Sequence, residues 1–170
     1  GFYGRTLSRA TSPPGREDVA ARLVRMALGQ QLGKLYSQRF VTRQTIASAE
    51  AMIGYLQRAF AERLTRATWM DEATRSQAQA KLARFKFKVG HPNRWRDFSG
   101  IRIVRDDAAG NLQRLWTWDW EHQLRRLDSK SDVELWYQTP QTVDASYSVL
   151  TNAIELPAAF LQPPYFDAAA

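Results

Sequence analysis

Residues 140–167 read PQTVDASYSVLTNAIELPAAFLQPPYFD, and this stretch decides the fold class. From Thr142 to Val149 polar and apolar residues alternate, and the apolar set is Val143, Ala145, Tyr147 and Val149. A period of two is typical of a half-buried strand, with one face packed and the other facing solvent or a ligand. After a break at residues 150–152 the alternation resumes and stops at Pro157, which lacks the N–H that a ladder needs. The stretch therefore predicts a β-hairpin.

Four segments before this stretch have apolar residues three and four positions apart, which is the spacing of amphipathic helices. We expect helices from after Gly15 to about Phe40, from about Thr45 to Ala67, after the N-cap Asp71, and from Gly110 to Leu127. Residues 116–120 also fit strand alternation, but their flanking leucines extend only the helical pattern. Residues 99–104 predict a short strand or extended segment. The predicted fold class is α+β and predominantly α-helical, with a helical bundle-like region followed by a β-hairpin and a Pro-rich tail.

Several side chains are expected to pack in these elements. Ala78, Leu82 and Phe85 form the predicted buried side of the third helix, and the tryptophans are interpreted as core residues and not as a stacking platform for bases. Gly29 and Gly33 lie one turn apart, which is typical either of a close approach by another helix or of two tolerated helix glycines.

The chain has 170 residues, a size that fits one domain. Its formal net charge of +7 is shared by basic nucleic-acid-binding modules. The basic residues are scattered among acidic ones on several predicted helices, so we interpret them as a solvated surface and expect no nucleic acid as partner. No apolar run approaches the roughly 18 residues that cross a bilayer, so we expect no transmembrane segment here.

Three runs in the C-terminal stretch match a known family at fixed spacing. They are Asp144-Ala145-Ser146-Tyr147, Asn152-Ala153-Ile154-Glu155-Leu156-Pro157-Ala158 and Leu161-Gln162-Pro163-Pro164-Tyr165-Phe166. In these runs the chain resembles the neprilysin and endothelin-converting-enzyme family of zinc metallopeptidases. Further matches lie upstream at Phe2-Tyr3-Gly4, Leu7-Ser8, residues 32–36, Trp69-Met70 and Trp95-Arg96-Asp97. The resemblance therefore covers nearly the whole chain.

The zinc ligands of that family are missing from this sequence. The family holds zinc with a His-Glu-x-x-His helix and a later glutamate, and it uses the first glutamate as general base. The two histidines, His91 and His122, are far apart in sequence and there is no cysteine. We therefore expect no metal site in this chain and zinc in a parent protein. The chain is interpreted as an internal fragment that ends before the zinc helix and is inactive on its own.

The resemblance implies a function and a place in the parent. The parent is expected to be a zinc-dependent metalloendopeptidase that hydrolyses peptide bonds in oligopeptides, so its partners are peptide substrates and the remainder of the catalytic domain. Residues 1–130 would belong largely to the smaller capping domain, and residues 131–170 to the catalytic domain. Animal members are disulfide-rich ectodomains, so the lack of cysteine points to a bacterial relative, and these are commonly exported, periplasmic or associated with the cell envelope.

The resemblance also implies four substrate-binding residues. Asp144 stands where the family has a substrate-binding asparagine, and the backbone of Ala145 would pair with the peptide main chain. Phe160 and Tyr165 match apolar positions that line the pocket for the residue after the scissile bond. Strand edges bind peptides of varied sequence through main-chain hydrogen bonds, which suits this role. The simpler alternative is an ordinary hairpin with packing aromatics.

Asp144 departs from the family pattern. An asparagine amide donates and accepts, whereas a carboxylate only accepts, so the change implies weaker binding, altered specificity or a degenerate site. Two other classes stay open: a non-catalytic peptide-binding or scaffold relative, and a basic helical nucleic-acid-binding module. Salt-sensitive retention on a DNA matrix would favour the latter.

Overall fold

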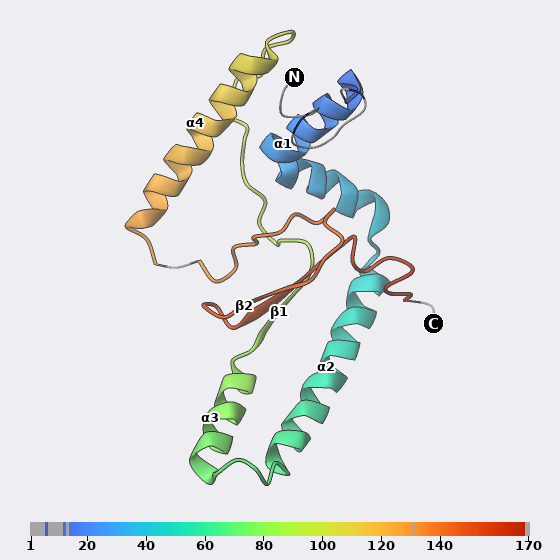
Figure 1. Ribbon diagram of the computed structural model, residues 1–170, viewed down its shortest axis with the longest axis vertical. Coiled ribbons are helices and arrows are strands. Elements are labelled where there is room, and N and C mark those ends of the chain that lie inside the picture. The colour runs from blue at the N-terminus through green and yellow to red at the C-terminus, as the bar shows by residue number, and fades with distance from the viewer. Residues whose placement is uncertain (1–5, 7–11, 13, 131, 169–170) are drawn as a thin grey trace. The chain divides into compact units, whose positions relative to one another are not determined.

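The computed structural model describes residues 6 and 12 and the ranges 14–130 and 132–168. The chain divides into two compact units, one made of residues 1–32 and 97–129 and the other of residues 33–96 and 130–170 (Figure 1). The predicted assignment of residues 1–130 and 131–170 to two domains of a parent protein stays a prediction. The matching residues Phe2, Tyr3, Gly4, Leu7 and Ser8 lie outside the described residues.

The first unit contains most of α1 and the whole of α4. Helix α1 spans Arg16–Phe40 and has non-helical backbone angles at Leu28 (φ −124°, ψ 28°), and the division between the units falls within this helix. Helix α4 spans Ala108–Leu127 and begins at Asp107, whose carboxylate accepts a hydrogen bond from the backbone N–H of Gly110 at 2.9 Å. Both predicted helices are confirmed, including the helical interpretation of residues 116–120.

The segment before α4 is not a strand. The side-chain amide of Asn111 donates to the carbonyl of Val104 at 2.7 Å, and its oxygen accepts from the Val104 N–H at 2.8 Å. These two bonds occupy the backbone groups that a neighbouring strand would need. Of the two alternatives predicted for residues 99–104, the strand is wrong: residues 99–101 form a turn and bend, and a local side chain satisfies the backbone of Val104.

The second unit contains α2 (Arg43–Thr65) and α3 (Glu72–Ala83), which contact each other (Figure 1). Each begins at a side chain that accepts from an N–H of the first turn, Thr42 from Thr45 at 3.0 Å and Asp71 from Thr74 at 2.7 Å. Both predicted helices are confirmed. No residue within α3 is fully buried, and its expected buried side chains, Ala78, Leu82 and Phe85, are half-buried.

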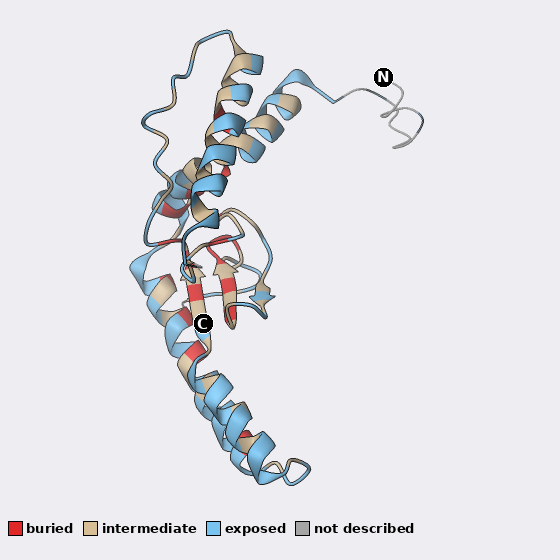
Figure 2. Ribbon diagram, turned by 90° about the vertical axis from the view of Figure 1, so that its left-hand side faces the viewer, coloured by how far each residue is buried: buried red, intermediate tan, exposed pale blue. Residues whose placement is uncertain are grey.

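A three-stranded sheet completes this unit. Its strands are β1 (Lys86–Gly90), β2 (Ser146–Ser148) and β3 (Ala153–Pro157), in the order β1-β3-β2. Strand β3 pairs in parallel with β1 and antiparallel with β2, and buried residues recur along β1 and β3 (Figure 2). The predicted hairpin is confirmed as β2 and β3 and the fold class as α+β, while β1 was not predicted.

Gly33 lies against a loop of the same unit. A Cβ at this position would lie 2.4 Å from Cδ of Pro140 and 2.8 Å from Oε1 of Gln141. The close approach considered for this glycine is therefore made by a loop and not by a helix.

Several apolar residues expected to pack lie at the surface of the described structure. Val143 is 56% exposed and Val149 is 74% exposed, so these two valines of the apolar face of residues 142–149 are not packed, whereas Tyr147 of the same face stacks on Phe85. Trp136 is buried, but the core interpretation is wrong for three other tryptophans, which are Trp69, Trp116 and Trp120. Periodicity groups apolar residues on one face of an element, but it does not state whether another element covers that face.

Of the helices in the described ranges, none combines the length and apolarity that crossing a bilayer requires.

Candidate functional site

Strand β2 is an edge strand. One of its sides pairs with β3, and within the described ranges its other side has no partner strand. The backbone N–H of Lys86 donates to the carbonyl of Asn152 at 3.0 Å, and that of Ala158 donates to the carbonyl of Gly90 at 2.8 Å. With the parallel register, these bonds direct the peptide groups of Ile154 toward β1 and those of Glu155 toward β2.

The same alternation fixes which groups of β2 face outward. Ser146 lies opposite Glu155 and Ser148 lies opposite Ala153, so the peptide groups of these two serines face β3. The N–H and C=O of Tyr147 between them face the open edge. Peptide groups alternate in direction along an extended chain, so those of Ala145, two residues before Tyr147, face that edge as well. This edge can accept an added strand through main-chain hydrogen bonds.

Asp144 and Ala145 are consecutive residues just before β2, at the start of this edge. Asp144 is exposed, and its Oδ1 accepts a hydrogen bond from the backbone N–H of Ala145 at 2.8 Å. Its Oδ2 lies 3.4 Å from the side-chain nitrogen of Gln138, a long and weak contact. The carboxylate therefore occupies a backbone donor at the position where the resemblance places a contact with a peptide.

Phe160 and Tyr165 are brought together in the turn that follows β3. Their ring centroids lie 5.3 Å apart at an interplanar angle of 21°, and Tyr165 is 63% exposed. The turn is joined to the segment before β2, because the N–H of Ala159 donates to the carbonyl of Pro140 at 2.8 Å. The two pairs of predicted site residues therefore belong to segments that meet at Pro140.

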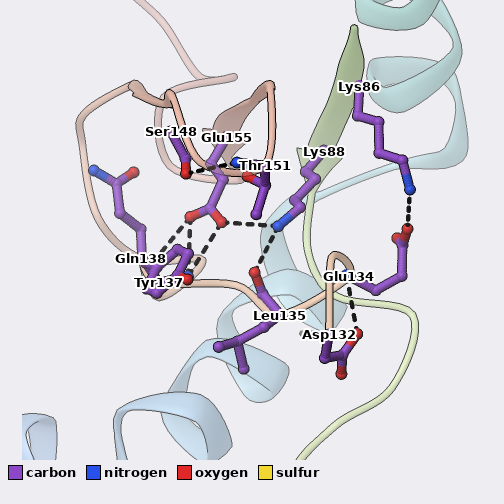
Figure 3. Close-up of polar contacts among 10 residues, drawn as sticks. All are labelled: Lys86, Lys88, Asp132, Glu134, Leu135, Tyr137, Gln138, Ser148, Thr151 and Glu155. Carbon is purple, nitrogen blue, oxygen red and sulfur yellow. Dashed lines mark hydrogen bonds and ion pairs between the residues drawn. The ribbon is translucent and has the colours of Figure 1, made fainter. Parts of the chain in front are cut away.

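A buried ion pair between Lys88 and Glu155 lies behind this edge (Figure 3). The two residues are direct partners across β1 and β3, 6% and 3% exposed, and Nζ of Lys88 lies 3.2 Å from Oε1 of Glu155. Sequence reasoning missed this pair, because a charged residue in an alternating strand is normally assigned to the solvent face. No local signal marked it, because the sequence did not predict β1 and the register that places Lys88 opposite Glu155 exists only in the folded sheet.

The carboxyl groups with shifted pKa values lie at a turn and at helix starts. A backbone hydrogen bond from Thr74 lowers the pKa of Asp71, and one from Ser99 lowers the pKa of Asp97. The side chain of Arg114 lowers the pKa of Asp107. The hydrogen bonds that lower these pKa values belong to local caps or turns. None of the three carboxyl groups is therefore indicated as an acid or base that acts on a substrate.

The described residues do not fit a zinc ion. In the ranges 14–130 and 132–168 no three His, Cys, Asp or Glu side chains group closely enough to hold a metal. His91 stacks on Trp95 at 5.8 Å, and His122 stacks on Trp118 at 5.0 Å. The two histidines therefore have local partners and do not converge with carboxylates.

A cavity of about 480 Å³ lies among α2, α3 and β1. Its lining includes the exposed side chains of Leu56 and Phe60 together with Phe87, and none of the four predicted site residues lines it. It therefore does not include the four predicted site residues, although Phe85 in its lining stacks on Tyr147 of β2 with ring centroids 5.5 Å apart.

Comparisons with known proteins place the chain in a family. The sequence model of peptidase family M13 matches residues 1–92. Human neprilysin is 25% identical over 174 residues, which cover 98% of this chain and 23% of neprilysin. Human endothelin-converting enzyme 1 is 30% identical over 146 residues, which cover 82% of this chain and 19% of that enzyme.

A solved structure agrees with these relatives. The zinc metalloprotease ZMP1 of Mycobacterium tuberculosis in its open state is 40% identical, with a TM-score of 0.90, over 99% of this chain and 26% of that protein. The chain thus spans 26% or less of the length of these three proteins. Because the family match covers more than half of the residues and the fold agrees with that of a solved relative, this chain belongs to peptidase family M13.

Proposed function

We propose that this chain is part of a larger zinc-dependent endopeptidase that hydrolyses peptide bonds in oligopeptides. Within it, the chain supplies chamber wall and a substrate-binding edge, and zinc is held by residues outside these 170. Family membership supports the reaction class, and the short span relative to the relatives supports a larger parent. On this proposal the isolated chain is inactive.

One observation carries the substrate-binding role: β2 is an edge strand whose outward peptide groups include those of Tyr147. A peptide lying along this edge forms main-chain hydrogen bonds whatever its side chains are, which suits an enzyme acting on varied oligopeptides. Asp144 and Ala145 meet the peptide at the start of the edge. Phe160 and Tyr165 present a stacked aromatic surface to an apolar side chain next to the scissile bond.

The test uses the full-length parent with its zinc and a set of peptides N-methylated at single positions. Methylation removes one N–H, so it should raise KM by about fivefold at positions whose N–H faces β2 and leave KM unchanged at the alternate positions. Uniform effects along the peptide contradict strand addition. Lack of zinc-dependent cleavage of any peptide contradicts the enzymatic proposal.

A second candidate function is peptide binding without cleavage. The hydrogen bond from Ala145 to Asp144 favours it, because it occupies a donor on the proposed substrate edge. Binding of uncleaved peptides by the zinc-loaded parent distinguishes this candidate from an active peptidase.

We also propose a cellular location for the parent protein. By family resemblance the parent is exported, periplasmic or associated with the cell envelope, and cell fractionation with an antibody to this chain tests that.

A further inference from the structure

We propose that Glu155, paired with Lys88, is a positioning residue that holds the segment carrying Asp144 in place for a peptide. The inference rests on the proposed function, because it concerns the same substrate edge. It adds a residue that does not itself touch the substrate.

The carboxylate of Glu155 anchors a loop through backbone groups (Figure 3). The N–H of Tyr137 lies 3.1 Å from both carboxylate oxygens, and the N–H of Gln138 lies 3.0 Å from Oε2. Lys88 donates to Oε1 of Glu155 and to the carbonyl of Leu135. Three residues around Trp136, which are Leu135 before it and Tyr137 and Gln138 after it, are thus tied to two buried side chains of the sheet.

Glu155 also holds the far end of the same segment. Its main chain lies opposite Ser146, the first residue of β2, and the alternation directs its peptide groups toward that serine. One residue therefore fixes residues 137–138 through its side chain and residue 146 through its backbone. Asp144 and Ala145 lie between these two attachments, and Gln138 reaches Asp144 with its side chain at 3.4 Å.

A contribution to stability alone does not account for this arrangement. Replacing a buried ion pair by apolar residues of similar size is often neutral or stabilising. Apolar replacements keep the packing between β1 and β3, but they cannot accept hydrogen bonds from Tyr137 and Gln138. The specific property of the pair is therefore the acceptor that it offers to the loop.

The test compares two double variants of the full-length zinc-loaded parent. K88M/E155L removes the charges and the acceptor, whereas K88M/E155Q removes the charges but keeps an amide oxygen that accepts from residues 137 and 138. The matched control is K86A/E134A, which removes an exposed ion pair of 3.0 Å to the same loop. Peptide KM and kcat, zinc content, melting temperature and amide hydrogen exchange at residues 137 and 138 are measured for each.

We expect K88M/E155L to raise KM by about fivefold with kcat within about twofold of wild type, and to lose exchange protection at residues 137 and 138. K88M/E155Q and K86A/E134A should keep both KM and protection close to wild type. Unchanged exchange protection at residues 137 and 138 in K88M/E155L overturns the anchor. An equal rise of KM in K88M/E155L and K88M/E155Q, accompanied by a lower melting temperature in both, overturns it as well. Lost protection with unchanged KM overturns the positioning role.

Amide hydrogen exchange does not depend on catalysis, so the experiment can contradict the proposed function and the role of Glu155 independently. Absence of peptide cleavage by the wild-type parent contradicts the proposed function, while exchange at residues 137 and 138 still decides whether Glu155 anchors the loop.

Discussion

The backbone N–H of Ala145 donates a hydrogen bond to the carboxylate of Asp144, with nitrogen and Oδ1 2.8 Å apart. Both residues lie where a peptide is proposed to join the edge of the sheet. A charged acceptor holds an N–H more strongly than a neutral one does, and a carboxylate offers no donor to a substrate carbonyl. The side chain of Asp144 therefore partly closes the proposed substrate edge.

Asp144→Asn in the parent protein should improve peptide cleavage. The amide releases the Ala145 N–H more readily and adds a donor, so we expect kcat/KM to rise by about 3- to 10-fold. Asp144→Ala serves as the control, because it frees the N–H without adding a donor and should give a smaller gain. An unchanged or lower kcat/KM for Asp144→Asn contradicts a substrate-binding role for this side chain.

The parts of the fold that depend on local sequence were predictable. Strand alternation and the stop at Pro157 identified the hairpin, and Asp71 identified the start of α3, because these signals depend only on neighbouring residues. The pairing of β1 with β3 joins segments far apart in the chain, and no local pattern states it.

The candidate site was predictable only in part. Family resemblance selected Asp144, Ala145, Phe160 and Tyr165. The fold stacks Phe160 on Tyr165, whereas Asp144 and Ala145 are already neighbours in the sequence. The burial of Lys88 and Glu155 follows from their register across two strands, and register is a property of the folded sheet. Alternation alone assigns such charged residues to solvent, so the anchor behind the site became visible only in three dimensions.

Asn152 should prove important for the hairpin through both its backbone and its side chain. It has a positive φ of 49°, its Oδ1 accepts from the Tyr147 hydroxyl at 3.0 Å, and its amide donates to the carbonyl of Lys81 at 2.9 Å. Asn152→Gly keeps the backbone angle and loses two bonds, so we expect a loss of about 0.5–1.5 kcal/mol in the free energy of unfolding. Asn152→Ala adds backbone strain and should lose about 1–3 kcal/mol. Urea unfolding measures both, and a less stable glycine variant would refute the strain argument.

Asp71 should make the protein sensitive to acid. The backbone hydrogen bond from Thr74 lowers the pKa of Asp71 below its ordinary 3.8, and the Thr74 hydroxyl and Arg75 act in the same direction. A group whose folded pKa is depressed stabilises the fold above its unfolded pKa and loses that effect as pH falls through the folded pKa. Asp71→Asn keeps a side-chain acceptor at the cap without the charge.

The stability advantage of wild type over Asp71→Asn should therefore be constant near neutral pH and shrink below about pH 4. Urea midpoints measured from about pH 7 to about pH 3 test this. Asp97 and Asp107 also have lowered pKa values, but both proteins contain them, so their contributions to the free energy of unfolding cancel in the comparison. An advantage that grows on acidification would show that the sign is wrong.

Two helix glycines of the same unit should respond in opposite directions to alanine. A Cβ at Gly33 would lie 2.4 Å from Cδ of Pro140, whereas one at Gly54 in α2 would meet only Nη1 of Arg58 at 3.6 Å, an ordinary contact. Gly54→Ala should stabilise the protein by about 0.5–1 kcal/mol, because alanine favours the helix. Gly33→Ala should destabilise it by about 1–3 kcal/mol, because the proline ring must move.

Thermal unfolding of the two variants side by side provides the measurement, since each is the control for the other. Pro140 begins the segment that leads to Asp144, and its carbonyl accepts from Ala159 in the turn that carries Phe160. A displaced Pro140 should therefore also weaken that bond and expose the Ala159 amide to hydrogen exchange. If both alanines stabilised the protein equally, the loop at Pro140 would move without a cost in free energy. Gly33 would then have no part in fixing the proposed substrate edge.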